Sequence, residues 1–282
     1  MAPRTSPGGR QRASRAEPVF DRILVGIDST DESLVAAAQA QVLRAPEGKL
    51  VLVAAVERHL AAHAGLLARY ADSDLAAGAS SELARARELV DADDALLASG
   101  SLVRLLRSQC GSRDATLIAV GVRPHRRLAA LTFGGHEVEA LHDVPCSLLI
   151  ARPGWGPSSP NRIVVGVDGS PESRTAEGVA RTLAARLECD VVPVVGLQED
   201  IDPGLLREER NDALLHPGSL LDAVVSTSSN RGLVVVGRAR ERDARRQSGL
   251  VERLVYATRC SVLVVEHTDA EGDGTPTATA DG

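Results

Sequence analysis

The chain has 282 residues, of which 44% are hydrophobic and only 2% aromatic, and its formal net charge at pH 7 is −6. This length suggests about two domains of ordinary size, with cores built from Leu, Val, Ile and Ala. No apolar run approaches the roughly 20 residues that would span a bilayer, and the acidic balance argues against a dedicated nucleic-acid-binding protein. We therefore expect neither a membrane nor a nucleic acid as partner.

The first 19 residues are expected to form a disordered tail. They carry Arg4, Arg10, Arg12 and Arg15 among Pro, Gly and Ser residues, and they lack the apolar segment of a secretory signal. A basic tail could contact nucleic acid or acidic lipid, but a solvated tail is the more common outcome.

A duplicated segment is the most informative feature of the chain. Residues 22–33 (RILVGIDSTDES) return as residues 162–173 (RIVVGVDGSPES), with 7 of 12 positions identical. Each copy is an apolar run that ends in Gly-x-Asp, followed by polar residues that suit a helix start, which predicts a strand and then a helix. A second phrase, DALLxxGSL, begins at Asp94 and again at Asp212, so the repeat covers much of both halves.

The first half alternates between expected strands and helices. In chain order we expect a strand at 23–27, a helix at 34–43, a buried strand at 49–56, a helix at 81–90, at best a short strand at 94–97, a helix from Gly100 to about Gln109, a strand at 115–120, a helix near 136–142 and a last strand at 147–150. Ser29 and Glu32 have capping-box spacing, which predicts Ser29 as the N-cap of the first helix.

The second half repeats this order after residues 153–160 (PGWGPSSP), a linker by composition. Strands are expected at 163–167, 191–195, 233–236 and 261–265. Pro171 falls at the first position of a helix, where a missing N–H costs nothing. Residues 268–282 are expected to form a second disordered tail. The expected domains are therefore residues 20–152 and 161–267.

Short apolar strands alternating with helices predict parallel sheets with right-handed crossovers. The expected fold class is α/β, with two tandem, open, five-stranded parallel-sheet domains of Rossmann-like type and helices on both faces. The repeated Gly-x-Asp places an acid at the carboxyl end of a strand, which is where open α/β sheets bind ligands.

Four scattered cysteines, Cys110, Cys146, Cys189 and Cys260, show no metal-like spacing and no Cys-x-x-Cys motif. This pattern indicates a reducing compartment, and we expect a cytoplasmic protein. Cys146 and Cys260 stand at equivalent repeat positions just before apolar strands, where we expect two small buried side chains.

With the strand, the Gly-x-Asp and the repeat together, the chain resembles the universal stress protein family, as a tandem two-domain member. The opening VGVDGSPES at residues 165–173 and the close VPCSLLI at residues 144–150 are similar to that family's usual opening and close. The resemblance implies the adenine nucleotide alpha hydrolase-like fold. The family commonly dimerises through its last strand, which implies that residues 148–150 and 262–265 pair antiparallel as an intramolecular pseudo-dimer; homo-oligomers stay open.

Nucleotide-binding members of the family carry Gly-x2-Gly-x9-Gly-Ser/Thr after the fourth strand, where backbone N–H groups and a helix start face the phosphates. The first half offers Gly121-Val122-Arg123-Pro124 and then Gly134-Gly135. Pro124 replaces the second glycine and lacks an N–H, and Gly135 lacks the hydroxyl. His125, Arg126 and Arg127 either compensate by charge or form a solvated basic loop.

The second half departs further from this pattern. Arg240 stands where the second glycine after Gly237 belongs, and Ser248-Gly249 falls near the expected Gly-Ser. The loop carries five arginines, Arg238, Arg240, Arg242, Arg245 and Arg246. They either grip an anion or form a solvated face, and the solvated face is our expectation.

The resemblance also implies the remaining candidate site residues. Asp28 and Asp168 match the family's acid beside the bound nucleoside; each can accept hydrogen bonds from ribose hydroxyls or an exocyclic amine, or serve the helix N-terminus. Ala55 is expected to line the adenine pocket. The full set of candidate nucleotide-binding residues is Asp28, Ala55, Gly121, Arg123, Gly134, Gly135, Asp168 and Gly237.

Catalytic signatures are missing from the sequence. There is no P-loop, no Gly-x-Gly-x-x-Gly after a strand and no Gly-x-Ser-x-Gly elbow. The segment HEVEALH at residues 136–142 lacks the second histidine of His-Glu-x-x-His, because position 140 is Ala. We expect no metal and no enzyme. The expected function is a stress-response regulatory module with ATP bound in the first half and none in the second; the alternative is an interaction protein of the same fold without nucleotide.

Overall fold

The computed structural model describes residues 19–56, 68–122, 141, 144–197, 212–238, 251 and 253–267. The first half contains, in order, β1 (Arg22–Ile27), α1 (Asp31–Leu43), β2 (Lys49–Val56), α2 (Ala68–Leu89), β3 (Asp94–Ser99), α3 (Leu102–Ser112), β4 (Leu117–Gly121) and β5 (Ser147–Ala151). The second half contains β6 (Arg162–Gly166), α5 (Pro171–Leu187), β7 (Asp190–Gly196), β8 (Leu214–His216), α7 (Leu220–Thr227), β9 (Leu233–Gly237) and β10 (Ser261–Val265).

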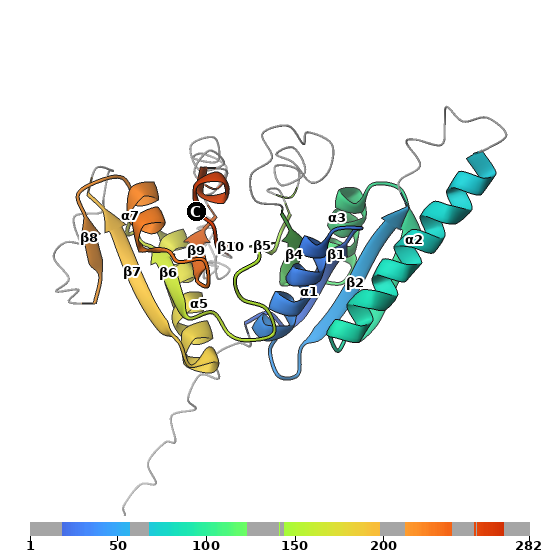
Figure 1. The fold of residues 1–282 in the computed structure, drawn as a ribbon. Helices are drawn as coiled ribbons and strands as arrows, with labels where there is room; N and C mark the ends of the chain where they lie inside the picture. Colours follow the sequence, from blue (N-terminus) through green and yellow to red (C-terminus); the bar gives the residue numbers. More distant parts are fainter. Residues whose placement is uncertain are drawn as a thin grey trace, which may run out of the picture.

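The strands form one ten-stranded sheet in the order β3-β2-β1-β4-β5-β10-β9-β6-β7-β8. The first five strands are parallel to one another, and so are the last five. The second half repeats the strand order of the first, which confirms the predicted α/β fold with two five-stranded parallel units. Figure 1 shows the two units side by side, with β5 and β10 between them.

The two units join through their last strands. β5 and β10 pair antiparallel, with Ile150 opposite Val262 and Leu148 opposite Val264. This confirms the predicted intramolecular pairing. It also removes two sheet edges that would otherwise expose unpaired backbone groups.

Helices cover both faces of the sheet, and each face has its own apolar core. One core lies under α1, α2 and α5 and includes Val25, Leu149, Val165 and Leu263. The other lies under α3, α7 and the helical residues 253–257. Both cores draw side chains from the two units, so the packing is continuous across the β5–β10 pair. Because helices pack on both faces of the sheet, whole strands such as β4 are buried.

The helix starts follow the local sequence, with one correction. Thr30, not Ser29, is the N-cap of α1, and its side chain accepts a hydrogen bond from the Ser33 N–H. The predicted Ser29–Glu32 capping box was therefore wrong by one residue, because the Asp28 side chain holds the turn and delays the first helical residue to Asp31. Pro171 begins α5 as predicted, after the N-cap Ser170.

Two elements differ in length from their predictions. α2 runs through 22 residues instead of the expected 81–90, and β3 has 6 residues instead of four. β8, for which no strand was predicted, supplies the fifth strand of the second unit with only 3 residues at the outer edge. α2 was predicted too short because its sequence is polar and Ala-rich, and β8 is too short to give a strand pattern. The helix expected near 136–142 and most of both tails lie outside the described residues.

The segment between the units is packed rather than loose. Trp155 is 3% exposed and belongs to the core under α1 and α5. Gly154 has a φ of 159°, and a Cβ there would lie 1.8 Å from the carbonyl oxygen of Asn230. The segment therefore contacts both units.

Candidate functional site

The topology of the first unit has a switch point at the carboxyl ends of β1 and β4. From β1 the chain moves through α1 to β2 on one side, and β4 pairs with β1 on the other side. The strand order thus reverses between β1 and β4, and ligands of open α/β sheets bind at such a point. Asp28 directly follows β1, and Gly121 is the last residue of β4.

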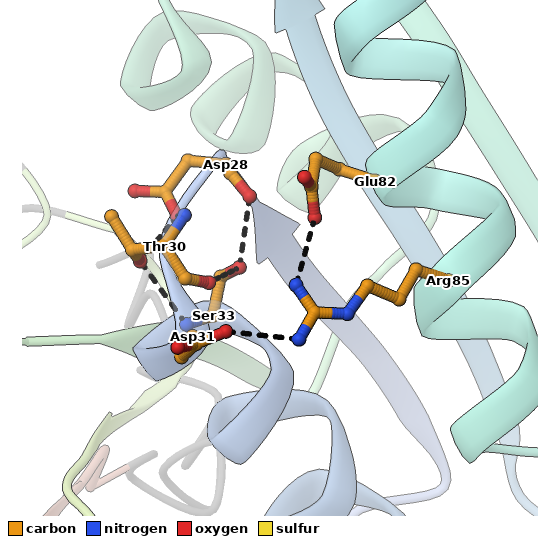
Figure 2. Close-up of polar contacts among 6 residues, drawn as sticks. All are labelled: Asp28, Thr30, Asp31, Ser33, Glu82 and Arg85. Carbon is orange, nitrogen blue, oxygen red and sulfur yellow. Dashed lines mark hydrogen bonds and ion pairs between the residues drawn. The ribbon is translucent and has the colours of Figure 1, made fainter.

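Asp28 organises the turn into α1. Its Oδ1 accepts hydrogen bonds from the Thr30 N–H at 2.9 Å and from the Thr30 hydroxyl at 2.5 Å (Figure 2). Its backbone carbonyl accepts a bond from the Ser33 hydroxyl at 3.1 Å. Among the described residues, no hydrogen bond to the Asp28 Oδ2 is found, and Oδ1 holds the turn into α1.

Gly121 lies directly against the first turn of α1. A Cβ at this position would lie 2.1 Å from the Glu32 carbonyl oxygen and 2.6 Å from the Ser33 nitrogen. Because Ser33 also donates to the Asp28 carbonyl, Asp28 and Gly121 contact the same helical turn. The two residues are therefore close together, as the sequence predicted.

The second unit repeats this arrangement. The Asp168 Oδ1 accepts the Ser170 N–H at 2.9 Å, as Asp28 does with Thr30. A Cβ on Gly237 would lie 2.4 Å from the Glu172 carbonyl oxygen. The structural part of each motif is thus conserved between the halves, whereas the loops that follow β4 and β9 differ in sequence.

Ala55 lies near the end of β2. Ile27 of β1 pairs with Ala54, so the next residue in this parallel register, Ala55, is level with Asp28. Ala55 is half-buried and packs against the α3-side core, so it lies at the same edge of the sheet as Asp28. The candidates Arg123, Gly134 and Gly135, together with Pro124, lie outside the described residues.

A surface ion pair joins α2 to the start of α1, near Asp28. Arg85 of α2 donates to Asp31 at the start of α1 at 3.0 Å, and its second nitrogen lies 3.8 Å from Glu82 (Figure 2). Arg85 is 55% exposed and Asp31 is 82% exposed, so the pair adds little stability. It ties the two helices together at the rim of the site.

Arg238 corrects the expectation for the arginine-rich loop. Its side chain is only 12% exposed, and it pairs with Glu266 at 2.8 Å. It donates to the carbonyl of Val144 and, at 2.9 Å, to that of Cys146, both in the other unit. The prediction of a solvated face is wrong for Arg238, because the partner unit supplies carbonyls that sequence reasoning could not place. The other four arginines lie outside the described residues.

Arg152 crosses in the opposite direction. It is 3% exposed, and it donates to the carbonyls of Val255 and, at 2.7 Å, Thr258. Burial lowers the pKa of this guanidinium. Gln39 completes the contact, with its amide nitrogen 2.9 Å from the Arg152 carbonyl and 2.7 Å from the Trp155 carbonyl. Arg152, Arg238 and Gln39 lie at the seam, where the two units meet at the β5–β10 pair, and they carry no sequence motif. The only signal in the sequence was Gln39, a polar residue among the apolar positions of α1.

No cluster of His, Cys, Asp and Glu side chains in the part of the chain that the structure covers could hold a metal ion. Among these same ranges, no helix has the length and apolar character needed to cross a membrane.

The chain is similar to known proteins in two ways: a family model matches the first unit, and several solved structures are similar to both units. Residues 20–152 match the model of the universal stress protein family. A universal stress protein from Archaeoglobus fulgidus has a similar structure, with a TM-score of 0.64 and 14% identity over 89% of this chain and 97% of that chain. Two structures from Pseudomonas aeruginosa each have a TM-score of 0.57 and 19% identity over 88% of this chain. One is a putative universal stress protein, of which 93% is covered, and the other is a functionally unknown protein, of which 92% is covered.

No curated protein matches the sequence. The first unit, residues 20–152, matches the universal stress protein family model, and this match agrees with the motifs quoted above. The similar structures extend the fold to both units, because each of the three covers nearly nine-tenths of this chain.

Proposed function

We propose that the protein is a non-catalytic regulatory module of the stress response that binds an adenine nucleotide in its first unit. The observation that carries this proposal is the convergence of Asp28 and Gly121 on one turn of α1, at the point where the strand order reverses. A nucleotide held there would bias a conformation or a partner surface.

Asp28 is the residue that we assign to the nucleoside. Its Oδ1 is occupied by Thr30, so the ligand would be bound by Oδ2. Ribose hydroxyls and the adenine amine are donors, and a carboxylate is an acceptor only. Gly121 lets β4 end against the first turn of α1. The phosphate-bearing part of the ligand would then meet the backbone after β4, where Arg123, Gly134 and Gly135 follow in sequence.

The second unit is proposed to bind no ATP. Its loop carries Arg240 in place of the second glycine, and Arg238 is engaged with the first unit. The second unit therefore acts as the partner that covers the β5 edge. We further propose the domain division 20–152 and 161–267, with the packed segment 153–160 between the two, and a cytoplasmic location in line with the cysteine pattern.

Isothermal titration of the full-length protein with ATP tests the nucleotide proposal. We expect one saturable site per chain with micromolar affinity. Asp28→Asn keeps an oxygen for the Thr30 N–H but removes the charge, so it should weaken binding about 10- to 100-fold, as expected for a hydrogen bond to a charged group. Asp168→Asn makes the same change in the second unit and should leave the affinity unchanged.

A nucleotide-independent interaction protein is the second candidate. Pro124 favours it, because a residue without an N–H replaces a phosphate-binding glycine. A flat titration up to millimolar ATP would support this function and overturn the first. Phosphate release above background would instead indicate an enzyme and contradict the non-catalytic assignment.

A further inference from the structure

Two cysteines of the first unit lie in direct contact. The Sγ atoms of Cys110, in the last turn of α3, and Cys146, just before β5, are 3.0 Å apart. Both residues are reduced in the structure and buried, at 1% and 3% exposure. A disulfide has an S–S distance of about 2.05 Å, so a shift of about 1 Å would join them. This pair could not be predicted from local sequence pattern, because 36 residues separate the two positions.

The second unit shows what the same place looks like without the pair. Cys260 is the repeat equivalent of Cys146, and Ser228 is the equivalent of Cys110 when the two DALLxxGSL phrases are superposed. Ser228 lies beside Cys260 and forms a hydrogen bond with it. Burial raises the pKa of Cys260. Ser228 is half-buried and is the C-cap of α7, whereas Cys110 is buried within α3. The second unit therefore lacks a buried pair of thiols.

The environment favours a thiolate on Cys110. Its contact with the Cys146 thiol lowers the pKa of Cys110, and the same contact raises the pKa of Cys146. The Arg238 guanidinium, which binds the Cys146 carbonyl at 2.9 Å, adds positive charge nearby. A lowered pKa makes a thiolate available as a nucleophile.

Cys110 lies close to solvent at the end of α3. The next two residues, Gly111 and Ser112, are exposed, and a Cβ on Gly111 would meet no atom within 4 Å. Last turns of helices fray readily. Opening one turn would therefore admit a molecule as small as a peroxide.

We propose that Cys110 and Cys146 are a peroxide-sensitive dithiol that closes to an intramolecular disulfide. The Cys110 thiolate attacks one oxygen of hydrogen peroxide, so an S–O bond forms, the O–O bond breaks and the hydroxide leaves as water after taking up a proton. The Cys146 sulfur then attacks the sulfenic sulfur, so the S–S bond forms and the S–O bond breaks, releasing a second water. Two thiols and one peroxide thus give one disulfide and two waters.

The bond would link α3 to the start of β5 and close the segment that holds β4 and Gly121. The carbonyl of Cys146 also accepts the Arg238 contact from the second unit. The disulfide would therefore affect the contact between the two units and the segment that carries β4. This effect does not depend on whether the first unit binds a nucleotide.

Peptide mapping of the full-length protein tests the proposal. Reduced protein is treated with equimolar hydrogen peroxide, denatured, alkylated with N-ethylmaleimide and digested without reductant. We expect a Cys110–Cys146 linked peptide, lighter by two hydrogens, as the main product, with Cys189 and Cys260 alkylated. Full alkylation of all four cysteines, or a main product at Cys189 or Cys260, would overturn the proposal.

Three variants sharpen the experiment. Cys110→Ser reproduces the pair of the second unit, and its Cys146 should remain fully alkylated after peroxide. Cys146→Ser removes the resolving thiol but keeps a hydroxyl donor beside Cys110, so Cys110 should persist as a sulfenic acid that dimedone traps. Cys260→Ser is the matched control and should give the same yield of linked peptide as the unmodified chain. A linked peptide lost in Cys260→Ser would contradict the pairing, and no dimedone adduct in Cys146→Ser would contradict the proposed order of attack.

Discussion

Ser147 and Ser261 occupy equivalent positions at the start of the two central strands, and each accepts a hydrogen bond from the far end of the other strand. The Glu266 N–H, just after β10, donates to the Ser147 hydroxyl at 3.1 Å. The Arg152 N–H, just after β5, donates to the Ser261 hydroxyl at 3.0 Å. The two serines thus close the antiparallel β5–β10 ladder at both ends.

The two serines should nevertheless differ in their contribution to stability. Ser261 is fully buried and also donates to the Gln39 Oε1 at 2.7 Å, whereas Ser147 has the Glu266 contact. Ser261→Ala leaves two buried groups without a partner, so we expect it to lower the free energy of unfolding by about 2 kcal/mol, and Ser147→Ala by about 1 kcal/mol or less. Urea denaturation measures both. Equal losses would show that the Gln39 contact contributes nothing.

Arg152 should be the most sensitive charged residue of the seam. Arg152→Met keeps much of the apolar volume but removes both donors to the carbonyls of Val255 and Thr258. We expect a loss of about 2–4 kcal/mol in the free energy of unfolding, because buried carbonyls lose charged donors.

The control for Arg152 is Arg113→Met. Arg113 is 37% exposed and pairs with Asp94 at 2.9 Å. An exposed pair contributes at most about 1 kcal/mol. A larger loss in Arg113→Met than in Arg152→Met, measured by the same urea denaturation, would contradict the importance of the buried crossing.

Gly121 should tolerate no side chain. Gly121→Ala places a Cβ 2.1 Å from the Glu32 carbonyl oxygen, where only a shift of α1 would make room. We expect a loss of about 3 kcal/mol or more in the free energy of unfolding, measured by thermal or urea unfolding. Substitutions of Gly121 therefore report on folding and are unsuitable as tests of nucleotide binding.

Gly178→Ala is the opposite case and serves as the control. Gly178 lies within α5, and a Cβ there would meet no atom within 4 Å. We expect it to raise the free energy of unfolding by about 0.5–1 kcal/mol, because alanine is the better helix former. A destabilising Gly178→Ala would show that the contact geometry does not govern these substitutions.

Asp94 should contribute to the decrease in the free energy of unfolding at acid pH. The hydrogen bond from the Arg113 side chain, followed by that from the Ala95 N–H, lowers the pKa of Asp94 below its ordinary value. A carboxylate with a lowered folded-state pKa stabilises the protein above its unfolded pKa, and this contribution is lost as the pH falls through the folded pKa.

The test compares unfolding free energies between about pH 6 and pH 2, a range that spans an ordinary Asp pKa. Asp94→Asn should make the decline with falling pH less steep. In an Arg113→Met background the same substitution should change the slope less, because the principal cause of the shift is gone. Identical slopes for Asp94→Asn and the unmodified chain would contradict the prediction.

Much of the fold could be read from local pattern. The apolar runs that became β1, β2, β4 and β5 are buried on both faces, and continuous apolar runs are typical of such strands. The duplicated Gly-x-Asp identified two related units, because each copy needs the same strand, turn and helix start. β8 and most of α2 lacked this signal, since exposed positions place few demands on residue type.

Part of the candidate site could likewise be predicted from local sequence pattern. Asp28 and Gly121 are short-range features, each at the end of an apolar run, and parallel strands bring such ends to one edge of the sheet. The sequence alone thus determined that there are two α/β units and which acid lies at the end of the first strand of each.

Only the tertiary structure decided what happens where the units meet. Arg152, Arg238 and Gln39 acquire their roles from carbonyls more than 90 residues away in the chain. Cys110 meets Cys146 because both side chains enter the same core on the α3 face of the sheet. Contacts of this kind depend on how two surfaces dock. A side chain's type states which bonds it can form, but the fold alone determines which partners come within reach.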